Sequence, residues 1–327
     1  FNSKVEFGRR LNFVTNRIPN FTEPEDLTHQ FIKMSDGRRM HVATVGSGEP
    51  LVFVHGWPEF WLTWMPVVNK LKDDFKCIMP CLYGFGLSDK PDALRDDLNA
   101  AFHADDIIQL VQKTCERPPV LIGHDIGSYV LQCCATMKFR SGEQLDPAGL
   151  IFFNCPTPSV GKEWIARGHV NEIWYQSFHL TPLAIDLVGH SRKTTEIYLE
   201  HFLRHWSFCE EAYKPFLSRL VEIFSSRNSM YGGFSWYKSN NDARLETIAG
   251  EKEPHNPKIK TPSAVLWGKH DPILRSNWAS HLHNNFEDVI IEFANESGHF
   301  VHFEQPDLAA DFVRTRLHEW FQDHSQS

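Results

Sequence analysis

The sequence predicts an α/β protein with a mostly parallel central sheet, flanking helices and a helical insertion. Along the first half of the 327-residue chain, short apolar runs alternate with segments of helical apolar spacing, and this alternation returns near the end. Between the two parts, roughly a hundred residues show a helical pattern without convincing strands. Parallel strands that are covered by helices on both faces are apolar throughout, which matches these runs.

The first predicted elements are a hairpin and a buried strand. The alternating segments HQFIKM and MHVATVG flank the turn SDGRR, and the apolar run LVFVHG follows. Helix and strand then alternate in the order EFWLTWMPVVNKLKDD, FKCIMP, LNAAFHADDIIQLVQKTC and PVLIG. This order predicts parallel strands joined by crossover helices.

The alternation stops after the strand GLIFFN. Residues 156–256 are rich in aromatic residues and predict a helical cap, after which the strands PSAVLWG and DVIIEFA and the helix PDLAADFVRTRLHEWFQ complete the core. We therefore expect core residues 1–155, a cap at 156–256 and the rest of the core at 257–327. Residues 1–27 show no pattern that predicts an element.

Charge and hydropathy exclude several classes of function. The formal net charge is -8, so the sequence predicts no basic surface for nucleic acid or anionic lipid. No stretch of about 18 apolar residues predicts a membrane span. We therefore expect a small-molecule partner, no nucleic acid and no membrane. The oligomeric state stays open, with a homodimer as one option.

Cysteine and histidine spacing indicates neither a disulfide framework nor a metal site. The seven cysteines are an odd number without C-x-x-C spacing, which favours reduced thiols and a cytoplasmic location. His201 and His205 have the i, i+4 spacing of one helix face, but no third ligand accompanies them. We expect no metal.

Asp125 stands at the centre of a G-x-D-x-G turn, residues 123–127, between a predicted strand and the helix that starts at Ile126. Many hydrolases carry a serine nucleophile on such a bend. Aspartate is also a favoured N-cap, so the helix start by itself explains the residue equally well. Other positions have to decide between a nucleophile and a cap.

Two such positions lie late in the chain. Asp271 follows the strand AVLWG and His299 follows the strand VIIEFA, so both belong to the carboxyl ends of parallel strands, where open α/β sheets place their ligand sites. Taken singly, Asp271 also fits a turn before Pro272, and His299 also fits ordinary packing. Together with Asp125 they give the order nucleophile, acid, histidine, which predicts a catalytic triad.

An aspartate nucleophile suits attack on a saturated carbon. Its carboxyl is ionised near neutral pH, because its ordinary pKa is about 3.9, and the alkyl ester that it forms can be cleaved by water, unlike the ether that serine would form. We expect His299, oriented by Asp271, to activate that water. The segment HGWPEFW offers the backbone N–H of Trp57, and the residue just after Asp125 offers that of Ile126. These two N–H groups could form an oxyanion hole, although HGWPEFW also fits a tight turn shaped by Gly56 and Pro58.

Five segments together resemble a known family. HGWPEFWLTW, GFGLSDKP, GHDIGS, GKHD and SGHFVHFEQP are similar to the α/β-hydrolase family, and specifically to its branch with an aspartate nucleophile, the epoxide hydrolases and dehalogenases. The resemblance covers nearly the whole chain from about residue 28. It implies Asp125, Asp271 and His299 as nucleophile, acid and base, no cofactor, and a cis peptide at Trp57–Pro58.

The leaving group separates the activities of this branch. An epoxide oxygen leaves as a basic alkoxide and needs a proton donor, whereas a halide needs only N–H donors. Epoxide hydrolases supply phenols from the cap; Tyr237 in GGFSWYKSNND resembles one of them, and Tyr175 in IWYQSFHL stands where the other is expected. Core packing is the alternative explanation for both tyrosines. The resemblance thus implies an epoxide hydrolase that converts a small apolar epoxide and water to a vicinal diol.

A haloalkane or haloacetate dehalogenase with the same triad is the alternative. Haloalkane dehalogenases usually carry tryptophan after the nucleophile, and fluoroacetate-type enzymes carry arginine there and a His-Trp pair in the cap. This chain has Ile126 and Tyr175-Gln176 at those places. Ile126 also departs from the tryptophan that is common in epoxide hydrolases, and Cys81 replaces a usual aspartate. A non-catalytic receptor would be expected to have lost a member of the triad.

Overall fold

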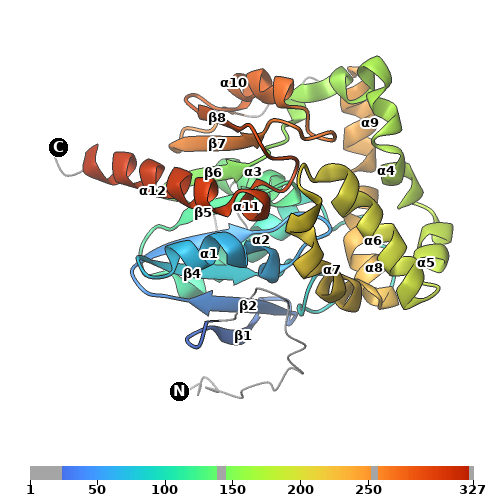
Figure 1. The fold of residues 1–327 in the computed structure, drawn as a ribbon, viewed down its shortest axis with the longest axis horizontal. Helices are drawn as coiled ribbons and strands as arrows, with labels where there is room; N and C mark the ends of the chain where they lie inside the picture. Colours follow the sequence, from blue (N-terminus) through green and yellow to red (C-terminus); the bar gives the residue numbers. More distant parts are fainter. Residues whose placement is uncertain (1–23, 138–144, 252–256, 324–327) are drawn as a thin grey trace.

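The computed structural model describes residues 24–137, 145–251 and 257–323. Most of the predicted patternless start, residues 1–27, lies outside these ranges. The centre is an eight-stranded sheet of order β1-β2-β4-β3-β5-β6-β7-β8, which runs from bottom to top in Figure 1. The strands are β1 (Thr28–Lys33), β2 (Arg39–Val45), β3 (Glu49–Val54), β4 (Phe75–Pro80), β5 (Val120–His124), β6 (Gly149–Phe153), β7 (Ser263–Gly268) and β8 (Ile290–Ala294).

The strands β4, β3, β5, β6, β7 and β8 pair in parallel, whereas β2 is antiparallel to both of its neighbours, β1 and β4. β1 and β2 form the predicted hairpin, whose turn contains Gly37 at a φ of 92°. Every residue of β5, β6 and β7 is buried, as expected for strands covered on both faces. The predicted α/β fold with a mostly parallel sheet is confirmed.

Helices cover both faces of this sheet (Figure 1). On one face, α1 (Met65–Leu71), preceded by the short helix η1 (Trp61–Trp64), packs against α11 (Val301–Glu304) and α12 (Pro306–Asp323). On the other face, α2 (Ala100–Thr114) packs against α3 (Ile126–Thr136). The final predicted helix corresponds to α12.

The chain between β6 and β7 is helical. Its elements are η2 (Pro158–Asn171), α4 (Trp174–Phe178), α5 (Pro182–Val188), α6 (Arg192–Trp206), α7 (Glu210–Phe224), α8 (Arg227–Ser239) and α9 (Asn241–Ala249). We call these elements the helical segment; they gather at one end of the sheet, on the right in Figure 1. The predicted boundary at residue 256 lies outside the described residues. After β7 come η3 (Ser276–His281) and α10 (Leu282–Asn285).

The helical segment touches the core through two glycines. A Cβ on Gly232 of α8 would lie 2.2 Å from the backbone oxygen of Gly84, and a Cβ on Gly84 would lie 2.6 Å from Cα of Gly232. Nearby, the backbone N–H of Arg95 donates to Oγ of Ser235 at 2.9 Å. The backbone of α8 therefore rests directly on the loop that follows β4.

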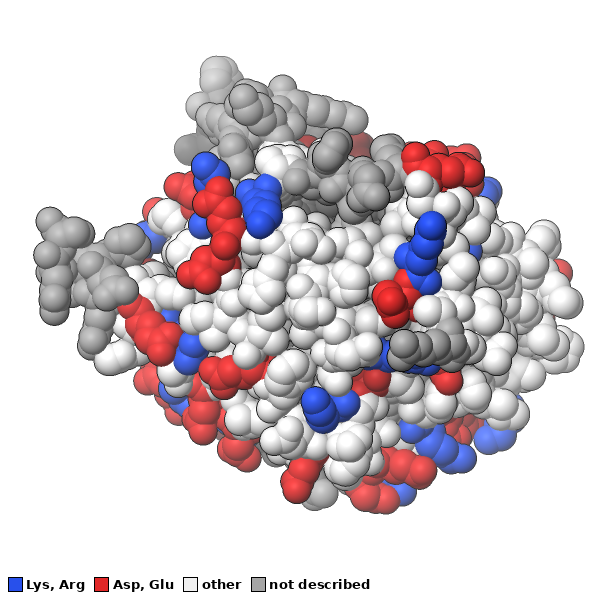
Figure 2. Space-filling view, turned by 90° about the horizontal axis from the view of Figure 1, so that it is seen from above, with Lys and Arg blue, Asp and Glu red and all other residues white. Residues whose placement is uncertain are grey.

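The surface shown in Figure 2 mixes both signs of charge. Among the residues drawn in colour, acidic and basic side chains are interspersed around a largely uncharged central area. All seven cysteines lie in described ranges and have free thiols. Within those ranges, each helix is too short or too polar to cross a bilayer.

Candidate active site

Asp125 occupies a strained bend between β5 and α3. Its φ of 49° and ψ of -114° are a conformation that residues with side chains rarely adopt. Close packing accompanies the bend, because a Cβ on Gly127 would lie 2.1 Å from the backbone oxygen of Val54, and one on Gly56 would lie 2.6 Å from Cβ of Asp125. The Asp125 side chain makes no capping hydrogen bond to α3, so the helix-cap explanation is wrong.

The Asp125 carboxylate receives a backbone hydrogen bond from the loop after β3. The N–H of Trp57 donates to Oδ2 of Asp125 at 3.1 Å, and the Trp57–Pro58 peptide is cis, as the resemblance implied. Ile126 opens α3, and the N–H groups of a first helical turn have no carbonyl partner within their helix. Both predicted oxyanion donors therefore lie near Asp125: Trp57 is close to it in space, and Ile126 is the next residue in the chain.

His299 and Asp271 form a buried pair. Nδ1 of His299 lies 2.8 Å from Oδ2 of Asp271, while Oδ1 of Asp271 accepts the N–H groups of Ile273 and Leu274 at 2.8 and 2.9 Å. Nε2 of His299 is buried and has no hydrogen-bond partner in the protein. Since Nδ1 donates to the carboxylate, Nε2 is the nitrogen that can accept a proton.

Nearby carboxylates raise the pKa of His299. Burial, the largest influence, works against the charged ring, but the charge of Asp271 and its hydrogen bond oppose it. The negative charges of Asp125 and Glu59 act in the same direction as Asp271, and together they raise the pKa of His299 to about 9.

Asn154 is a site residue that the sequence prediction missed. It follows β6 directly at a φ of 49°, is fully buried, and donates from Nδ2 to Oδ2 of Asp271 and to the backbone oxygen of Gly298. Its Oδ1 accepts the N–H of Gly268 at 2.9 Å. Asn154 thus ties the ends of β6 and β7 to the loop of His299. A polar residue directly after a buried parallel strand was the available signal.

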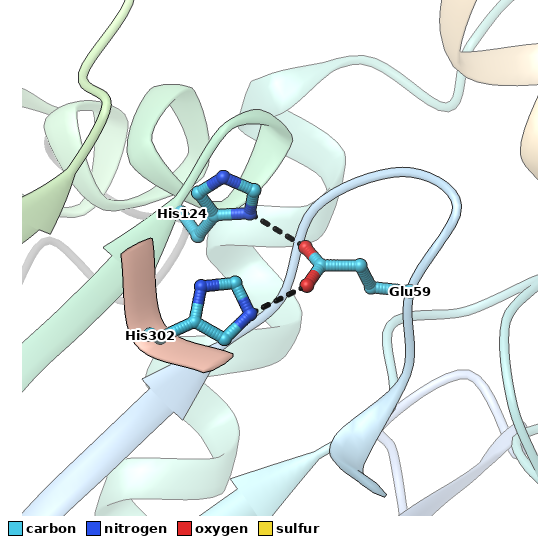
Figure 3. Close-up of side chains that lie close together, drawn as sticks. All are labelled: Glu59, His124 and His302. Carbon is cyan, nitrogen blue, oxygen red and sulfur yellow. Dashed lines mark hydrogen bonds and ion pairs between the residues drawn. The ribbon is translucent and has the colours of Figure 1, made fainter. Parts of the chain in front are cut away.

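Behind the pair lies a second buried cluster of Glu59, His124 and His302 (Figure 3). Oε2 of Glu59 lies 2.6 Å from Nδ1 of His124 and accepts the N–H of Gly56 at 2.9 Å, while Oε1 lies 2.7 Å from Nε2 of His302. All three side chains are inaccessible to solvent. These partners hold the pKa of Glu59 well below its usual range, although burial alone would raise it.

This cluster, which we call the Glu59 cluster, reaches the backbone of His299. Nε2 of His124 lies 2.8 Å from the backbone oxygen of His299, so both ring nitrogens of His124 face acceptors, and the ring donates to both only when it carries two protons. Burial lowers the pKa of His302 to about 4, against the influence of Glu59. Neutral His302 then donates to Glu59 from Nε2.

Asp125 and His299 open onto one cavity of about 270 Å³ between the core and the helical segment. Tyr175 of α4 and Tyr237 of α8 line the same cavity, with ring centres 5.4 Å apart. Burial, followed by the charge of Asp125 for Tyr175, raises the pKa of both phenols. Both tyrosines therefore stay protonated at neutral pH.

The cavity contains further polar groups that the sequence prediction did not select as site residues. Gln176 donates from Nε2 toward the Tyr175 hydroxyl at 3.5 Å, Tyr129 of α3 lies in the wall near Asp125, and Arg244 of α9 lies in the opposite, helical part of the wall. Burial raises the pKa of Tyr129, and the charge of Asp125 adds to this. Helical periodicity alone does not show which face of α9 or α3 borders a cavity.

The sequence matches the alpha/beta hydrolase family over residues 51–312. The chain belongs to this family. This alpha/beta hydrolase is 27% identical to the soluble epoxide hydrolase of Corynebacterium sp. (strain C12), over 88% of this chain and 96% of that protein. It is 25% identical to the AB hydrolase superfamily protein YfhM of Bacillus subtilis (strain 168), over 87% of this chain and 96% of that protein.

A solved structure gives the same fold. The epoxide hydrolase CorEH without ligand superposes on this alpha/beta hydrolase with a TM-score of 0.72 at 24% identity, over 90% of this chain and 99% of that chain. The predicted family resemblance is thus confirmed, and the chain is a hydrolase of the alpha/beta family.

We expect the ring of His299 to titrate near pH 9 in the free protein. Asp125→Asn removes a nearby negative charge at constant shape, so it should lower this pKa, and Asp271→Asn should lower it more because Asp271 has the larger influence. Nitrogen-15 NMR of histidine-labelled protein measures both shifts, with His299→Gln to identify the resonance. Asp186→Asn, an exposed site, is the control. An unchanged pKa in Asp125→Asn would show that the two side chains do not interact.

We also expect Glu59→Gln to lower the free energy of unfolding by about 3–5 kcal/mol, because the amide has one acceptor oxygen where the carboxylate serves three donors in a buried site. Urea denaturation measures the loss. The control is Glu172→Gln, which removes the partly exposed pair with His205 and should cost less than about 1 kcal/mol. Equal losses in the two variants would contradict the assignment of the Glu59 cluster as a main stabilising element.

Proposed function

We propose that this alpha/beta hydrolase opens epoxides to vicinal diols through a covalent ester on Asp125. The observation that carries the proposal is the shared cavity, which brings Asp125 and His299 together with two protonated phenols, Tyr175 and Tyr237. In this proposal residues 156–256 form a cap that supplies the phenols. Residues 1–155 and 257–327 form the core that supplies nucleophile, base and acid.

In the first half-reaction, a carboxylate oxygen of Asp125 attacks one carbon of the epoxide and forms a C–O ester bond. The ring C–O bond breaks, and its electron pair goes to the epoxide oxygen, which takes a proton from one of the two phenols in the cavity wall, Tyr175 and Tyr237. The raised pKa values of these phenols suit them to protonate a strongly basic alkoxide.

In the second half-reaction, Nε2 of His299 takes a proton from a water molecule, and the resulting hydroxide attacks the ester carbonyl of Asp125. The N–H of Trp57 and that of Ile126 stabilise the oxyanion. Collapse of this intermediate breaks the ester C–O bond, and the departing alkoxide takes the proton of the new carboxyl group, so the diol leaves and Asp125 is again a carboxylate. The proton that His299 gives up after ester formation returns to the phenolate through solvent, and the proton taken from water restores the resting imidazolium. The sum is one epoxide and one water consumed for one diol.

Ester formation itself prepares the base. In the free protein the charge of Asp125 helps to raise the pKa of His299 to about 9, which keeps the ring largely protonated at neutral pH. Esterification removes that charge, so the pKa of His299 falls when the neutral ring is needed. A resting imidazolium therefore agrees with a base that acts only in the second step.

The two phenols favour an epoxide over a halide substrate. A departing halide needs hydrogen-bond donors but no proton, whereas an epoxide oxygen needs both. The relative from Corynebacterium, named a soluble epoxide hydrolase and aligned over most of both chains, supports the same choice.

The first test is turnover of styrene oxide, a linear terminal epoxide, a bromoalkane and fluoroacetate by wild-type and Tyr237→Phe proteins. We expect diol from the epoxides and a loss of kcat/KM of about tenfold or more in the variant, with Tyr175 retaining part of the acid function. Tyr231→Phe, on the same helix but outside the cavity lining, is the matched control. Halide release without diol would favour the dehalogenase, and no turnover of any substrate would contradict both.

The second test is isolation of the ester. In His299→Gln the second half-reaction should slow strongly, so the protein should consume no more than one equivalent of epoxide quickly, release little diol, and gain the mass of the epoxide on the peptide that contains Asp125. Mass spectrometry after proteolysis locates the adduct, and the Asp125→Asn, His299→Gln double variant should gain none. An adduct at another residue, or steady turnover without any adduct, would refute the covalent mechanism.

A further inference from the structure

Among the described residues that line the cavity, Arg244 is the one arginine. It lies on α9, whose inner face also presents Ala243 and Thr247 to the cavity, and its side chain is half-buried. The rest of the lining is largely apolar and aromatic, with Trp164 and Trp236 among its members. A permanently charged guanidinium in such a wall needs an explanation.

No carboxylate among the described residues pairs with Arg244. The hydrogen bond from its Nη2 goes to Oδ1 of Asn241 at 3.0 Å, one turn away on the same helix. In contrast, Arg227 on the neighbouring helix α8 pairs with Asp186 at 2.8 Å, and Arg38, also partly buried, pairs with Asp106 at 2.7 Å. A guanidinium has five N–H donors, so most of those of Arg244 are left for a ligand.

The acidic residues of α9 face away from the cavity. Asp242 and Glu246 line a separate surface hollow on the outer side of the helix, together with Leu245. Burial lowers the pKa of Arg244, and only Tyr175 opposes this, so the cost of partial desolvation is not offset by a protein anion. On the side of α9 that borders the cavity, the described residues thus provide no carboxylate that would neutralise the charge of Arg244.

The other polar groups on this wall already have partners. The amide of Asn240 donates to the backbone oxygen of Trp236 at 2.7 Å. The hydroxyl of Thr247 donates to the backbone oxygen of Ala243, also at 2.7 Å. Arg244 is therefore the group on the α9 wall with donors to spare. The cavity has a negative group, Asp125, in its core wall and a positive group in its helical wall.

We propose that Arg244 binds an anionic group of the substrate, so that the site takes epoxides that carry a carboxylate a short carbon chain away from the ring. This inference rests on the proposed function. Arginine matches a carboxylate with two parallel hydrogen bonds, and the chain between the two ends lies along the apolar lining. The cavity of about 270 Å³ limits the substrate to a small molecule.

Electrostatics explains why such a substrate needs this residue. Asp125 is negative before it reacts, and the whole chain carries a formal charge of -8, so a carboxylate substrate is repelled both on approach and beside the nucleophile. Arg244 offsets this repulsion at the end of the substrate that does not react. It is a specificity-determining residue and takes no part in bond making.

The test compares 5,6-epoxyhexanoate with 1,2-epoxyhexane, which differ by the carboxylate. We expect the wild-type protein to favour the acid in kcat/KM by about tenfold or more, and Arg244→Gln to lose about 10- to 100-fold on the acid, mostly through KM. The same variant should stay within about threefold of wild type on 1,2-epoxyhexane. Arg244→Lys should restore part of the preference, and Arg227→Gln, the control on the surface of α8, should match wild type.

A binding measurement separates this inference from the proposed reaction. Calorimetry of hexanoate and hexan-1-ol with the wild-type protein should show tighter binding of hexanoate, and Arg244→Gln should abolish the difference. If neither epoxide turns over but hexanoate binds through Arg244, the proposed function fails and the anion site stands. Equal losses on both epoxides, an unchanged preference in Arg244→Gln, or equal binding of the two ligands would overturn the anion site.

Discussion

At Asp125 the chain turns from β5 into α3 with a φ of 49°, and the turn is closed because α3 and β3 approach through backbone atoms at Gly127. This conformation points a carboxylate outward from the carboxyl edge of a parallel sheet. The neighbouring strands end at the same edge, so their loops bring Trp57, Asn154 and Asp271 to the same place. A strained backbone of this kind persists only where the surrounding packing over-determines it, and here the close approach of α3 to the end of β3 does so.

Two buried carboxylates then fix the position of His299. Asp271 holds Nδ1 of His299, while the Glu59 cluster holds its backbone oxygen through His124, and the backbone N–H of His299 donates to Trp206 of α6 at 2.7 Å. A buried charge costs little only when its hydrogen-bond partners are complete, and both carboxylates meet this condition. The ring is therefore oriented from the core and from the helical segment together.

The sequence was sufficient for the sheet, the order of its elements and the placement of Asp125, Asp271 and His299 together at one edge of the sheet, because parallel strands appear as uniform apolar runs and these three residues follow closely after such strands. Asn154 obeys the same rule and could have been found with it. The Glu59 cluster could not, since Glu59 and His302 are 243 positions apart and meet only in the folded protein. The role of Arg244 depends on which face of α9 the other helices leave open, and helical periodicity does not contain that information.

The contact between Gly84 and Gly232 links the size of the cavity to the position of Tyr237. Five positions after Gly232, the same helix carries Tyr237, so the separation of the two backbones sets how far this phenol stands from Asp125. A side chain at either glycine would push α8 away from the loop that follows β4. It would enlarge the cavity without altering a single residue of its lining, and it would move Tyr237 outward at the same time. Under the proposed reaction, room for a larger substrate at that contact is therefore gained only by loosening the alignment of Tyr237 with Asp125.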